Sequence, residues 1–343
     1  MGDILEKENI MKAFIVDHYG SNDGVRAGEM PDPELRDDDV LVEIHAASVN
    51  PLDFKIRDGK LKLILPYRLP FILGNDLAGV VVRVGSRVRR FKPGDEVYAR
   101  TDKDRIGSFA EFISIKEDAL AIKPKKLTME EAASIPLVGL TAWQALIERA
   151  NLKKGLRVLI HAGSGGVGTF AIQLAKHVGA IVATTTSTEN LDWVKRLGAD
   201  IVIDYRKDDF ETILHDYDVV FDTLGGEVLE KSIRVLKPGG KLISIAGLPD
   251  SDFAKELGLS RILRLVMYFM SYRIRIKAKR HHVSYSFLFM RPSGDQLREI
   301  GSLIDSGIIR PVVDRVFPFE STKEALAYVE KGRAKGKVIV KVR

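Results

Sequence analysis

The chain has 343 residues and no cysteine, which excludes disulfides, thiolate nucleophiles and every zinc site built on cysteine. At about 150 residues per domain, this length suggests about two domains, and 45% apolar with 29% charged residues is an ordinary globular composition. A net charge of +6 does not by itself indicate a nucleic-acid partner, because an anionic small molecule would explain it equally well.

The first ten residues, MGDILEKENI, are polar and charged and lack the apolar core of a signal peptide. We expect them to form a disordered extension before the first strand. No uncharged apolar run reaches the 18 or so residues of a membrane span. By default, the expected location is the cytoplasm.

Residues 11–125 contain short β-type segments broken by Gly, Pro and Asp, which predicts a compact β-rich domain. Residues 128–150 follow as a helical stretch. Thr128 and Glu131 have the spacing of a capping box at its start.

An alternation of apolar strands and amphipathic helices begins near residue 158. Strand-like runs occupy 158–162, 181–186, 201–205, 219–224, 241–247 and 283–290. Nearly continuous β-branched strands that alternate with helices are typical of a parallel sheet covered on both faces. The fold class is therefore α/β, with a doubly wound parallel sheet of six strands beside the β-rich domain. The last 50 or so residues add a helix pattern around 321–331 and a strand at 337–342.

A glycine-rich loop connects the first strand of this alternation to its first helix. A GxGxxG motif in that position is typical of a dinucleotide site, with the pyrophosphate at the helix N-terminus. We expect Gly163 to permit the tight turn, Gly165 to let the backbone approach the anion, and Gly168 to allow close helix–strand packing. The alternative is a plain βα turn. The loop consists of Gly163, Ser164, Gly165, Gly166, Val167 and Gly168.

The end of the second strand selects the dinucleotide. A site for NAD usually has Asp or Glu there, which accepts from the ribose 2′-hydroxyl. Here residues 184–188 are all Thr or Ser, and the first acid is Glu189. Hydroxyls can donate to a 2′-phosphate, and Arg206 and Lys207 could add positive charge, so we predict NADPH. The alternative is that these Thr residues only suit a strand end.

Eight motifs give the chain a family resemblance. It resembles the zinc-independent quinone oxidoreductases and alkenal (enone) reductases of the medium-chain dehydrogenase/reductase superfamily. The resemblance runs from Met11 to Arg343. The motifs are SVNPLDFKIRDG (48–59), LGNDLAGVVVRVG (73–85), FKPGDEVYA (91–99), GSFAEF (107–112), AASIPLVGLTAW (132–143), HAGSGGVG (161–168), LGADIVIDY (197–205) and GKVIV (336–340).

This resemblance implies a domain organisation. Residues 1–136 and 292–343 would form a GroES-like catalytic domain, and residues 137–291 a Rossmann NADP-binding domain inserted between them. It also implies a homodimer paired through the last Rossmann strand, which would protect that sheet edge.

One departure from the superfamily concerns zinc. Its zinc alcohol dehydrogenases use cysteines and a Gly-His-Glu motif, whereas this chain has Gly74-Asn75-Asp76, no cysteine and no His pair with ligand spacing. We therefore expect no metal site, and an acceptor that is already electrophilic, such as a quinone or enone, which needs no Lewis acid. A second departure is Asn190, which stands where many NADPH-dependent relatives have Lys.

The resemblance also implies site residues. Asn50 would lie near the nicotinamide or substrate, Lys55 could donate to the substrate oxygen, and Asp53 could orient either one. Alternatively, Asp53 only caps a helix and Lys55 is a solvated side chain. Tyr67 is a further candidate proton donor without motif support.

For the cofactor, the resemblance implies contacts outside the loop that could instead be packing residues. Phe287, with Phe289, would either wall the nicotinamide pocket or belong to a dimer core. The implied cofactor residues are Thr141, Thr186, Ser187, Asn190, Tyr205, Gly247 and Phe289.

Residues 253–282 are longer than the segment that the family usually has there. A helical pattern gathers apolar residues on one face and is followed by basic residues. Three alternatives stay open: a helix packed over the cleft or the dimer seam, a membrane-surface helix that makes weak contact, or a nucleic-acid contact, which we do not expect because a stacking pattern is lacking. The face consists of Leu259, Ile262, Leu263, Val266, Phe269 and Met270.

Together these features predict a zinc-independent, NADPH-dependent oxidoreductase that reduces a quinone or an α,β-unsaturated carbonyl. The alternative is a relative with little turnover that senses NADPH or binds RNA or a membrane surface.

Overall fold

The computed structural model describes residues 10–343. The expected disordered extension falls on residues 1–9, outside the described part, whereas Ile10 already belongs to the first strand. The chain divides into two compact units: unit 1 contains the residues through Leu140 together with Arg291–Arg343, and unit 2 is Thr141–Met290. Across residues 10–343, every helix is too short or too polar to traverse a bilayer.

Unit 1 is built on two β-sheets. The larger has strand order β15-β16-β3-β5-β6-β8 with β7 also on β3, and the smaller has order β2-β1-β4. All pairs are antiparallel except β15 with β16. The strands are β1 (Ile10–Val16), β2 (Val25–Pro31), β3 (Asp39–Val49), β4 (Phe71–Ile72), β5 (Asp76–Val84), β6 (Glu96–Arg100), β7 (Phe112–Lys116), β8 (Leu120–Ile122), β15 (Val313–Pro318) and β16 (Lys337–Lys341).

The helices of unit 1 differ in part from the expected pattern. The predicted capping box is confirmed, because Thr128 and Glu131 each accept from the other's backbone N–H. The single stretch over 128–150 is wrong: Pro136 starts a new helix, since proline has no N–H to continue the previous one. A π-helical turn, Gln144–Arg149, follows this helix. The helices are α1 (Pro51–Arg57), α2 (Met129–Ala133), α3 (Pro136–Trp143, across the division between the units), α11 (Gly294–Asp305) and α12 (Thr322–Glu330).

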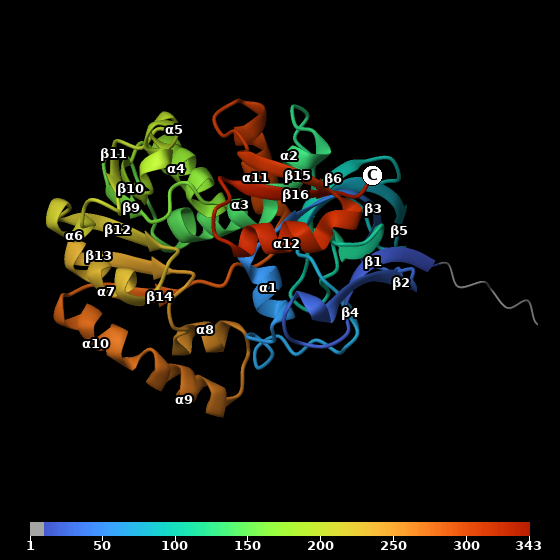
Figure 1. Cartoon of the computed structure of the whole chain (residues 1–343), viewed down its shortest axis with the longest axis horizontal. Helices are drawn as coiled ribbons and strands as arrows, with labels where there is room; N and C mark the ends of the chain where they lie inside the picture. Colours follow the sequence, from blue (N-terminus) through green and yellow to red (C-terminus); the bar gives the residue numbers. More distant parts are fainter. Residues whose placement is uncertain (1–9) are drawn as a thin grey trace, which may run out of the picture. The chain divides into compact units, whose positions relative to one another are not determined.

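Unit 2 contains the predicted parallel sheet of six strands. Its order is β11-β10-β9-β12-β13-β14, so the chain starts in the middle, moves to one edge, and then returns past the start to the other edge. Right-handed crossovers in opposite directions place helices on opposite faces; Figure 1 shows α4 and α5 on one face, and α7 and α10 on the other. The strands are β9 (Arg157–Ile160), β10 (Ile181–Thr186), β11 (Ile201–Asp204), β12 (Tyr217–Asp222), β13 (Leu236–Ser244) and β14 (Ser284–Phe287), and the helices are α4 (Gly166–Val178), α5 (Leu191–Arg196), α6 (Phe210–Ile213), α7 (Gly226–Val235), α8 (Ser251–Glu256), α9 (Arg261–Met270) and α10 (Tyr272–Arg280).

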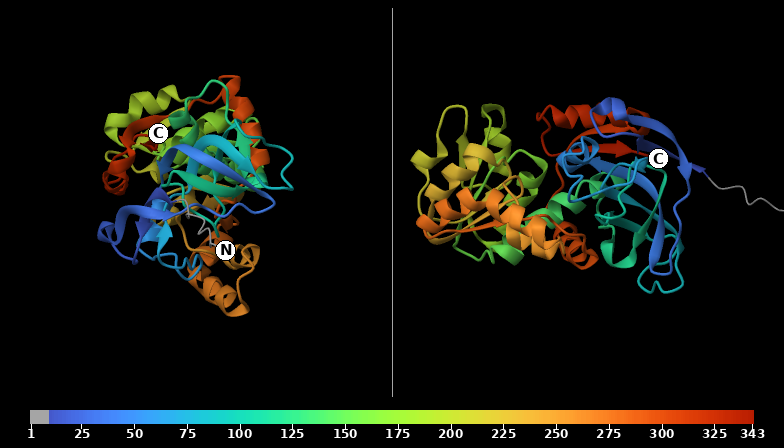
Figure 2. Two further views of the ribbon diagram at one scale, coloured as in Figure 1. Left: turned by 90° about the vertical axis from the view of Figure 1, so that its right-hand side faces the viewer. Right: turned by 90° about the horizontal axis from the view of Figure 1, so that it is seen from below.

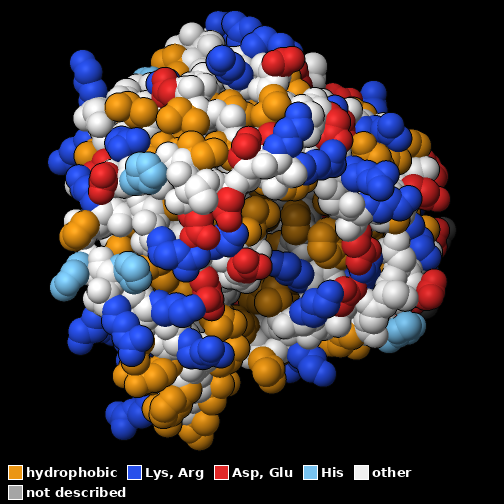
Figure 3. All heavy atoms as spheres, turned by 60° about the vertical axis from the view of Figure 1, so that its left-hand side comes forward, with side chains coloured by type: hydrophobic (Ala, Val, Ile, Leu, Met, Phe, Trp, Pro, Cys, Tyr) orange, Lys and Arg blue, Asp and Glu red, His pale blue; other side chains and the backbone are white. Residues whose placement is uncertain are grey.

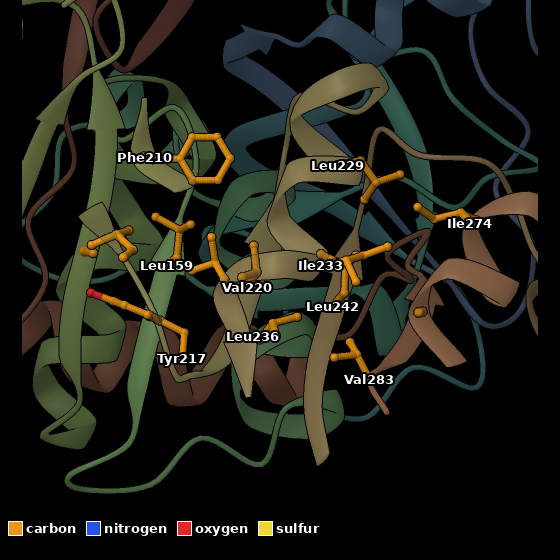
Figure 4. Packing of buried hydrophobic residues seen from close by; sticks show 14 of the residues in the cluster. Leu159, Phe210, Tyr217, Val220, Leu229, Ile233, Leu236, Leu242, Ile274 and Val283 are labelled. Carbon is orange, nitrogen blue, oxygen red and sulfur yellow. The ribbon is translucent and has the colours of Figure 1, made fainter. Parts of the chain in front are cut away.

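One hydrophobic cluster of unit 2 lies between the sheet and the helices of the second face. Buried aliphatic residues of β9, β12 and β13 meet Leu229 and Ile233 of α7 and Ile274 of α10 (Figure 4). Each large side chain buried in this way contributes about 1.5–3 kcal/mol. This packing fixes the sheet, and with it the loops at the carboxyl ends of the strands.

Candidate functional site

The glycine-rich loop lies between β9 and α4, as predicted. The first helical hydrogen bond is from the Thr169 N–H to Gly165 O, at 2.9 Å. The N–H groups of Gly166, Val167 and Gly168 precede it, so helix geometry leaves them without intrahelical partners. The amino end of a helix of 13 residues is thus available to a phosphate.

The loop glycines serve different purposes. A Cβ on Gly168 would lie 2.2 Å from Ala162 O, so the predicted close packing of helix and loop is confirmed. Gly163 is required for close packing and not for the expected tight turn. Its φ is not positive, and a Cβ there would lie 2.3 Å from Thr184 Oγ1. The left-handed residue of the turn is Ala162, with φ 53°. At Gly165 only one atom would contact a Cβ, at 3.3 Å, which leaves room beside this backbone for an anion.

The residues at the end of β10 fit a phosphorylated ribose. Thr186 is buried, and its Oγ1 has no hydrogen-bond partner among the described residues. An unpaired buried hydroxyl is costly unless something else bonds it. Nearby, the Asn190 amide donates to Ser187 Oγ at 3.0 Å and accepts from Trp193 Nε1 at 2.9 Å. Asn190 is thereby held in place with a second amide hydrogen still to donate.

Positive charge is present beside this strand end, but it is already paired. Arg206 donates to Glu189 at 2.6 Å, and Lys207 lies 3.8 Å from Asp204. Hydrogen bonds from its own backbone N–H, Ser187 and Arg206 lower the pKa of Glu189 to about 2, so its carboxylate stays charged. A 2′-phosphate would have to compete with this carboxylate for Arg206. Tyr205 is exposed beside them.

His161 is a residue of the loop motif to which the sequence assigned no role. Its ring nitrogens lie 3.1 Å from Thr185 Oγ1 and 2.9 Å from Ser232 Oγ. Burial lowers the pKa of this imidazole to about 3, so the ring is neutral. It ties β9 to β10 and α7 directly below the phosphate loop.

A second buried group joins the ends of β12 and β13. Asp222 accepts from Ser244 Oγ at 2.5 Å and from Gly225 N–H at 3.0 Å, and burial raises its pKa. Ser244 Oγ in turn accepts from the N–H of Gly247 at 2.7 Å. A Cβ on Gly247 would lie 2.7 Å from Tyr285 Oη, so a side chain here would displace neighbouring groups.

Two predicted cofactor residues lie elsewhere in unit 2. Thr141 is buried in α3. The expected strand over 283–290 is too long, because β14 ends at Phe287 and Phe289 lies beyond it. Both phenylalanine rings contact Phe253 of α8, with centroids 5.0 Å and 6.0 Å away.

In unit 1, Asn50 lies at the centre of a buried polar cluster. Its amide donates to Asp76 Oδ2 at 2.9 Å and to Ser48 O at 3.3 Å. Its Oδ1 accepts from Lys337 Nζ at 2.5 Å, and this ammonium also donates to Val49 O at 3.1 Å. Both amide hydrogens are used inside the protein, so Asn50 is suited to positioning neighbouring groups rather than donating to a substrate.

Asp53 joins the same cluster from the first turn of α1. It accepts from the Asn50 backbone N–H at 2.7 Å and from Asn75 Nδ2 at 2.7 Å. Burial raises the pKa of Asp53 to about 7, with a further increase from the Asp76 charge. The ammonium of Lys337 lies 3.6 Å from Asp76 Oδ2 and offsets the charge of that carboxylate. Asp53 is therefore the carboxyl group that retains its proton up to about pH 7.

Lys55 stands apart from this cluster. Asp53 bonds Asn50 and Asn75, not Lys55. The Lys55 side chain is exposed on α1 and makes no side-chain bond among the described residues. Tyr67 donates its phenol hydrogen to Lys103 O at 2.5 Å, and burial raises its pKa. Of the proposed donors, Lys55 therefore has the freest hydrogens.

Asp76 and Lys337 were not among the predicted site residues. Two signals could have found them: a charged residue that opens the apolar strand after Gly74-Asn75, and a lysine at the start of the apolar run of β16. Within residues 10–343, no group of three or more His, Asp or Glu side chains is arranged to hold a metal ion.

Comparisons with known proteins match this architecture. Residues 36–125 match the alcohol dehydrogenase GroES-like domain, and residues 197–340 match the zinc-binding dehydrogenase family. The NAD(P)H oxidoreductase RTN4IP1, mitochondrial, of Danio rerio is 36% identical and aligned over 98% of this chain and 92% of its own.

Two further similarities cover nearly all of this chain. The NADPH-dependent alkenal/one oxidoreductase, chloroplastic, of Arabidopsis thaliana is 37% identical over 96% of this chain and 79% of its own. The solved structure of the quinone oxidoreductase from Coxiella burnetii superimposes with a TM-score of 0.86 at 34% identity, over 98% of this chain and 100% of its own. The chain therefore belongs to the medium-chain dehydrogenase/reductase superfamily, in its zinc-independent quinone and enone reductase branch.

Proposed function

We propose that this protein is an NADPH-dependent oxidoreductase that transfers a hydride to a quinone or to the C=C bond of an α,β-unsaturated carbonyl. The observation that supports NADPH is the end of β10, which has hydroxyls and no carboxylate. It lies beside the phosphate loop, which precedes α4 in the middle of the 3-2-1-4-5-6 sheet. The acceptor class is supported by the relatives, one named as an alkenal/one oxidoreductase and one as a quinone oxidoreductase.

The chemistry divides between cofactor and chain. NADPH supplies the hydride when bound, and the acceptor is already electrophilic. The loop N–H groups would bind the pyrophosphate, while Thr186 and Ser187 would bind the 2′-phosphate. In an enone, the carbonyl oxygen gains negative charge as the hydride arrives, and a nearby donor stabilises it.

We assign that donor role to Lys55, because its ammonium is exposed whereas the donors of Asn50 are used within the buried cluster. Asn50 and Asp53 are then positioning residues, which hold the start of α1 against β5 and β16. The Lys55→Ala variant should lower kcat at least about threefold, roughly 0.65 kcal/mol. Lys62→Ala, at an exposed lysine a few residues on, is the matched control and should leave kcat unchanged; equal rates in both variants would remove Lys55 from the mechanism.

The test of the function is consumption of NADPH and of NADH over a panel of quinones and enones. We expect turnover with NADPH on at least one acceptor class, and a clear preference over NADH. Saturable NADPH binding without turnover on any acceptor would favour the alternative, a sensor or binding protein.

We also propose a homodimer and a cytoplasmic location. β14 is an edge strand of the sheet and pairs only with β13 among the described strands, so a second copy could continue the sheet. The Tyr285 N–H points away from β13, because the alternate residue Leu288 bonds Ser244 of β13. Tyr285→Pro, which removes this outward donor, should then convert a dimer to a monomer in light scattering. For the location, cell fractionation is the test, since the relatives include proteins named mitochondrial and chloroplastic.

A further inference from the structure

Helix α9 has an apolar face that no other part of the described chain covers. Ile262 is 76% exposed, Phe269 64% and Leu265 57%. These residues and Val266 recur at the i, i+3, i+4 and i+7 positions of one helix face. Of the 18 large hydrophobic side chains exposed in the described chain, seven fall within residues 262–272, so the exposure is a concentrated patch rather than a scatter.

The neighbouring helices bury their own apolar residues, and α9 does not. The expected apolar face is right except for Leu259, which lies outside any helix, because its other members belong to α9. The segment 253–282 as a whole divides into α8, α9 and α10. Phe253 of α8, and Ile274 and Ala278 of α10, are buried in unit 2. From α9 only Met267 is buried. The helix is thus held between α8 and α10, which precede and follow it in the chain (Figures 1 and 2), while its apolar residues are exposed.

The same segment is strongly basic. Residues 257–282 contain seven Lys or Arg and no Asp or Glu, a charge of +7 against +6 for the entire chain. Lys277 pairs with Glu230 of α7, and Arg275 lies 4.4 Å from the ring of Tyr268. Among the described residues, Arg261, Arg264 and Arg280 have no ion pair. Figure 3 shows the apolar patch at the lower end of the molecule, with Lys and Arg side chains beside it.

We propose that α9 and α10 dock this protein on a membrane surface that carries anionic lipid. An apolar helix face with cationic flanks lies in the plane of such a surface, with its apolar residues among the acyl chains and its basic groups at the headgroups. Arg261 and Arg264, at the start of α9, reach the headgroups while their aliphatic stems stay against the apolar layer.

Charge favours a lipid surface over a second copy of the chain. In a two-fold dimer the same patch contacts itself, so two segments that each carry seven Lys or Arg would meet, with Glu230 of α7 offsetting one of these cations, Lys277. Like charges in contact oppose association. Anionic lipid offers the opposite charge together with an apolar layer.

The test is co-sedimentation of the full-length protein with phosphatidylcholine vesicles, with and without phosphatidylglycerol, and without substrate or NADPH. Salt of about 0.01 M and about 1 M sets screening lengths of about 30 Å and about 3 Å. We expect binding only to the anionic vesicles, at the lower salt. Ile262→Ser/Phe269→Ser and Arg261→Gln/Arg264→Gln should each reduce the partition coefficient about tenfold or more.

Matched controls carry the same changes elsewhere. Leu63, in unit 1, is 77% exposed, and Leu63→Ser and Lys331→Gln/Arg333→Gln should alter binding less than about twofold, well below the losses expected at α9. Absence of binding to anionic vesicles at low salt would overturn the proposal, and so would equal losses in the controls. A change from dimer to monomer in Ile262→Ser/Phe269→Ser, with unchanged vesicle binding, would instead assign the patch to a second copy. None of these measurements depends on turnover, so they stand apart from the enzymatic test.

Discussion

Replacing Lys337 by Met tests the buried polar cluster of unit 1. The side chain is 5% exposed, and its ammonium bonds Asn50 Oδ1 and lies 3.6 Å from Asp76 Oδ2. Met has similar length and packs adequately, so the change removes a charge rather than volume. The Asp76 carboxylate would remain buried, still accepting from Ser48, Asn50 and the Leu137 N–H, but without its cation.

The cost follows from that uncompensated charge. Removal of one partner from a buried ion pair costs about 3–5 kcal/mol. In a unit of this size, that corresponds to a loss of roughly 6–20 °C in melting temperature. Burial lowers the pKa of Lys337, whereas the Asp76 charge opposes this shift. The bonds of Lys337 to Asn50 and Val49 carry part of the total cost.

Two spectroscopic probes separate the units. The two tryptophans, Trp143 and Trp193, both lie in unit 2, whereas far-ultraviolet circular dichroism reports both units. In guanidinium, Lys337→Met should lower the midpoint seen by circular dichroism more than the midpoint seen by fluorescence. Lys341→Met, at the exposed end of the same strand, removes a surface ion pair to Glu130 and should cost less than about 1 kcal/mol.

The result that would refute this reasoning is a cost for Lys337→Met no greater than that of the Lys341 control. The double variant Lys337→Met/Asp76→Asn adds a second check. If the two charges compensate each other, its loss must be smaller than the sum of the single losses. Additive losses would mean that Lys337 and Asp76, although 3.6 Å apart, contribute no interaction energy to stability.

Three further predictions test the site. Gly168→Ala places a methyl group 2.2 Å from a carbonyl oxygen and should cost about 1–3 kcal/mol in thermal unfolding. Gly165→Ala should fold normally and weaken NADPH binding in a fluorescence titration. Equal melting temperatures of the two variants would contradict the close packing inferred at Gly168. Glu189→Gln should release Arg206 and raise the affinity for NADPH, but not for NADH, about threefold to tenfold. Arg206→Ser should instead lower the affinity for NADPH. Unchanged affinities would mean that the 2′-phosphate binds elsewhere. Burial raises the pKa of Asp53 to about 7, so the folded protein retains a proton that the unfolded chain loses near pH 4. The resulting stability, up to about 4 kcal/mol, should decline as pH rises from about 4 to 7. The denaturation midpoints of Asp53→Asn should lack this decline, and a pH profile parallel to that of the unchanged protein would show that another group titrates.

Local sequence was enough to predict the sheet of unit 2. The strands β9 to β12 are rich in β-branched residues and alternate with helical segments, which predicts a doubly wound sheet without tertiary information. Predicted strand ends were less accurate where an apolar run is longer than the paired strand. Phe289 continues the apolar pattern of β14, but β14 pairs with β13 only from Ser284 to Phe287. The helix over 128–150 was wrong for a related reason, because periodicity does not register the break at Pro136.

What the sequence by itself determined is the chemistry available to this protein: no thiol for metal or nucleophile, a glycine loop between strand and helix, and a strand end with hydroxyls instead of a carboxylate. What only the tertiary structure decided is which groups meet. Asn50, Asp76 and Lys337 are far apart in the chain, and only the pairing of β3 with β5 and β16 brings them within bonding distance. The same holds for α9: its apolar periodicity is visible in the sequence, but whether that face is inside or outside depends on what α8 and α10 bury, and the structure leaves it facing outward.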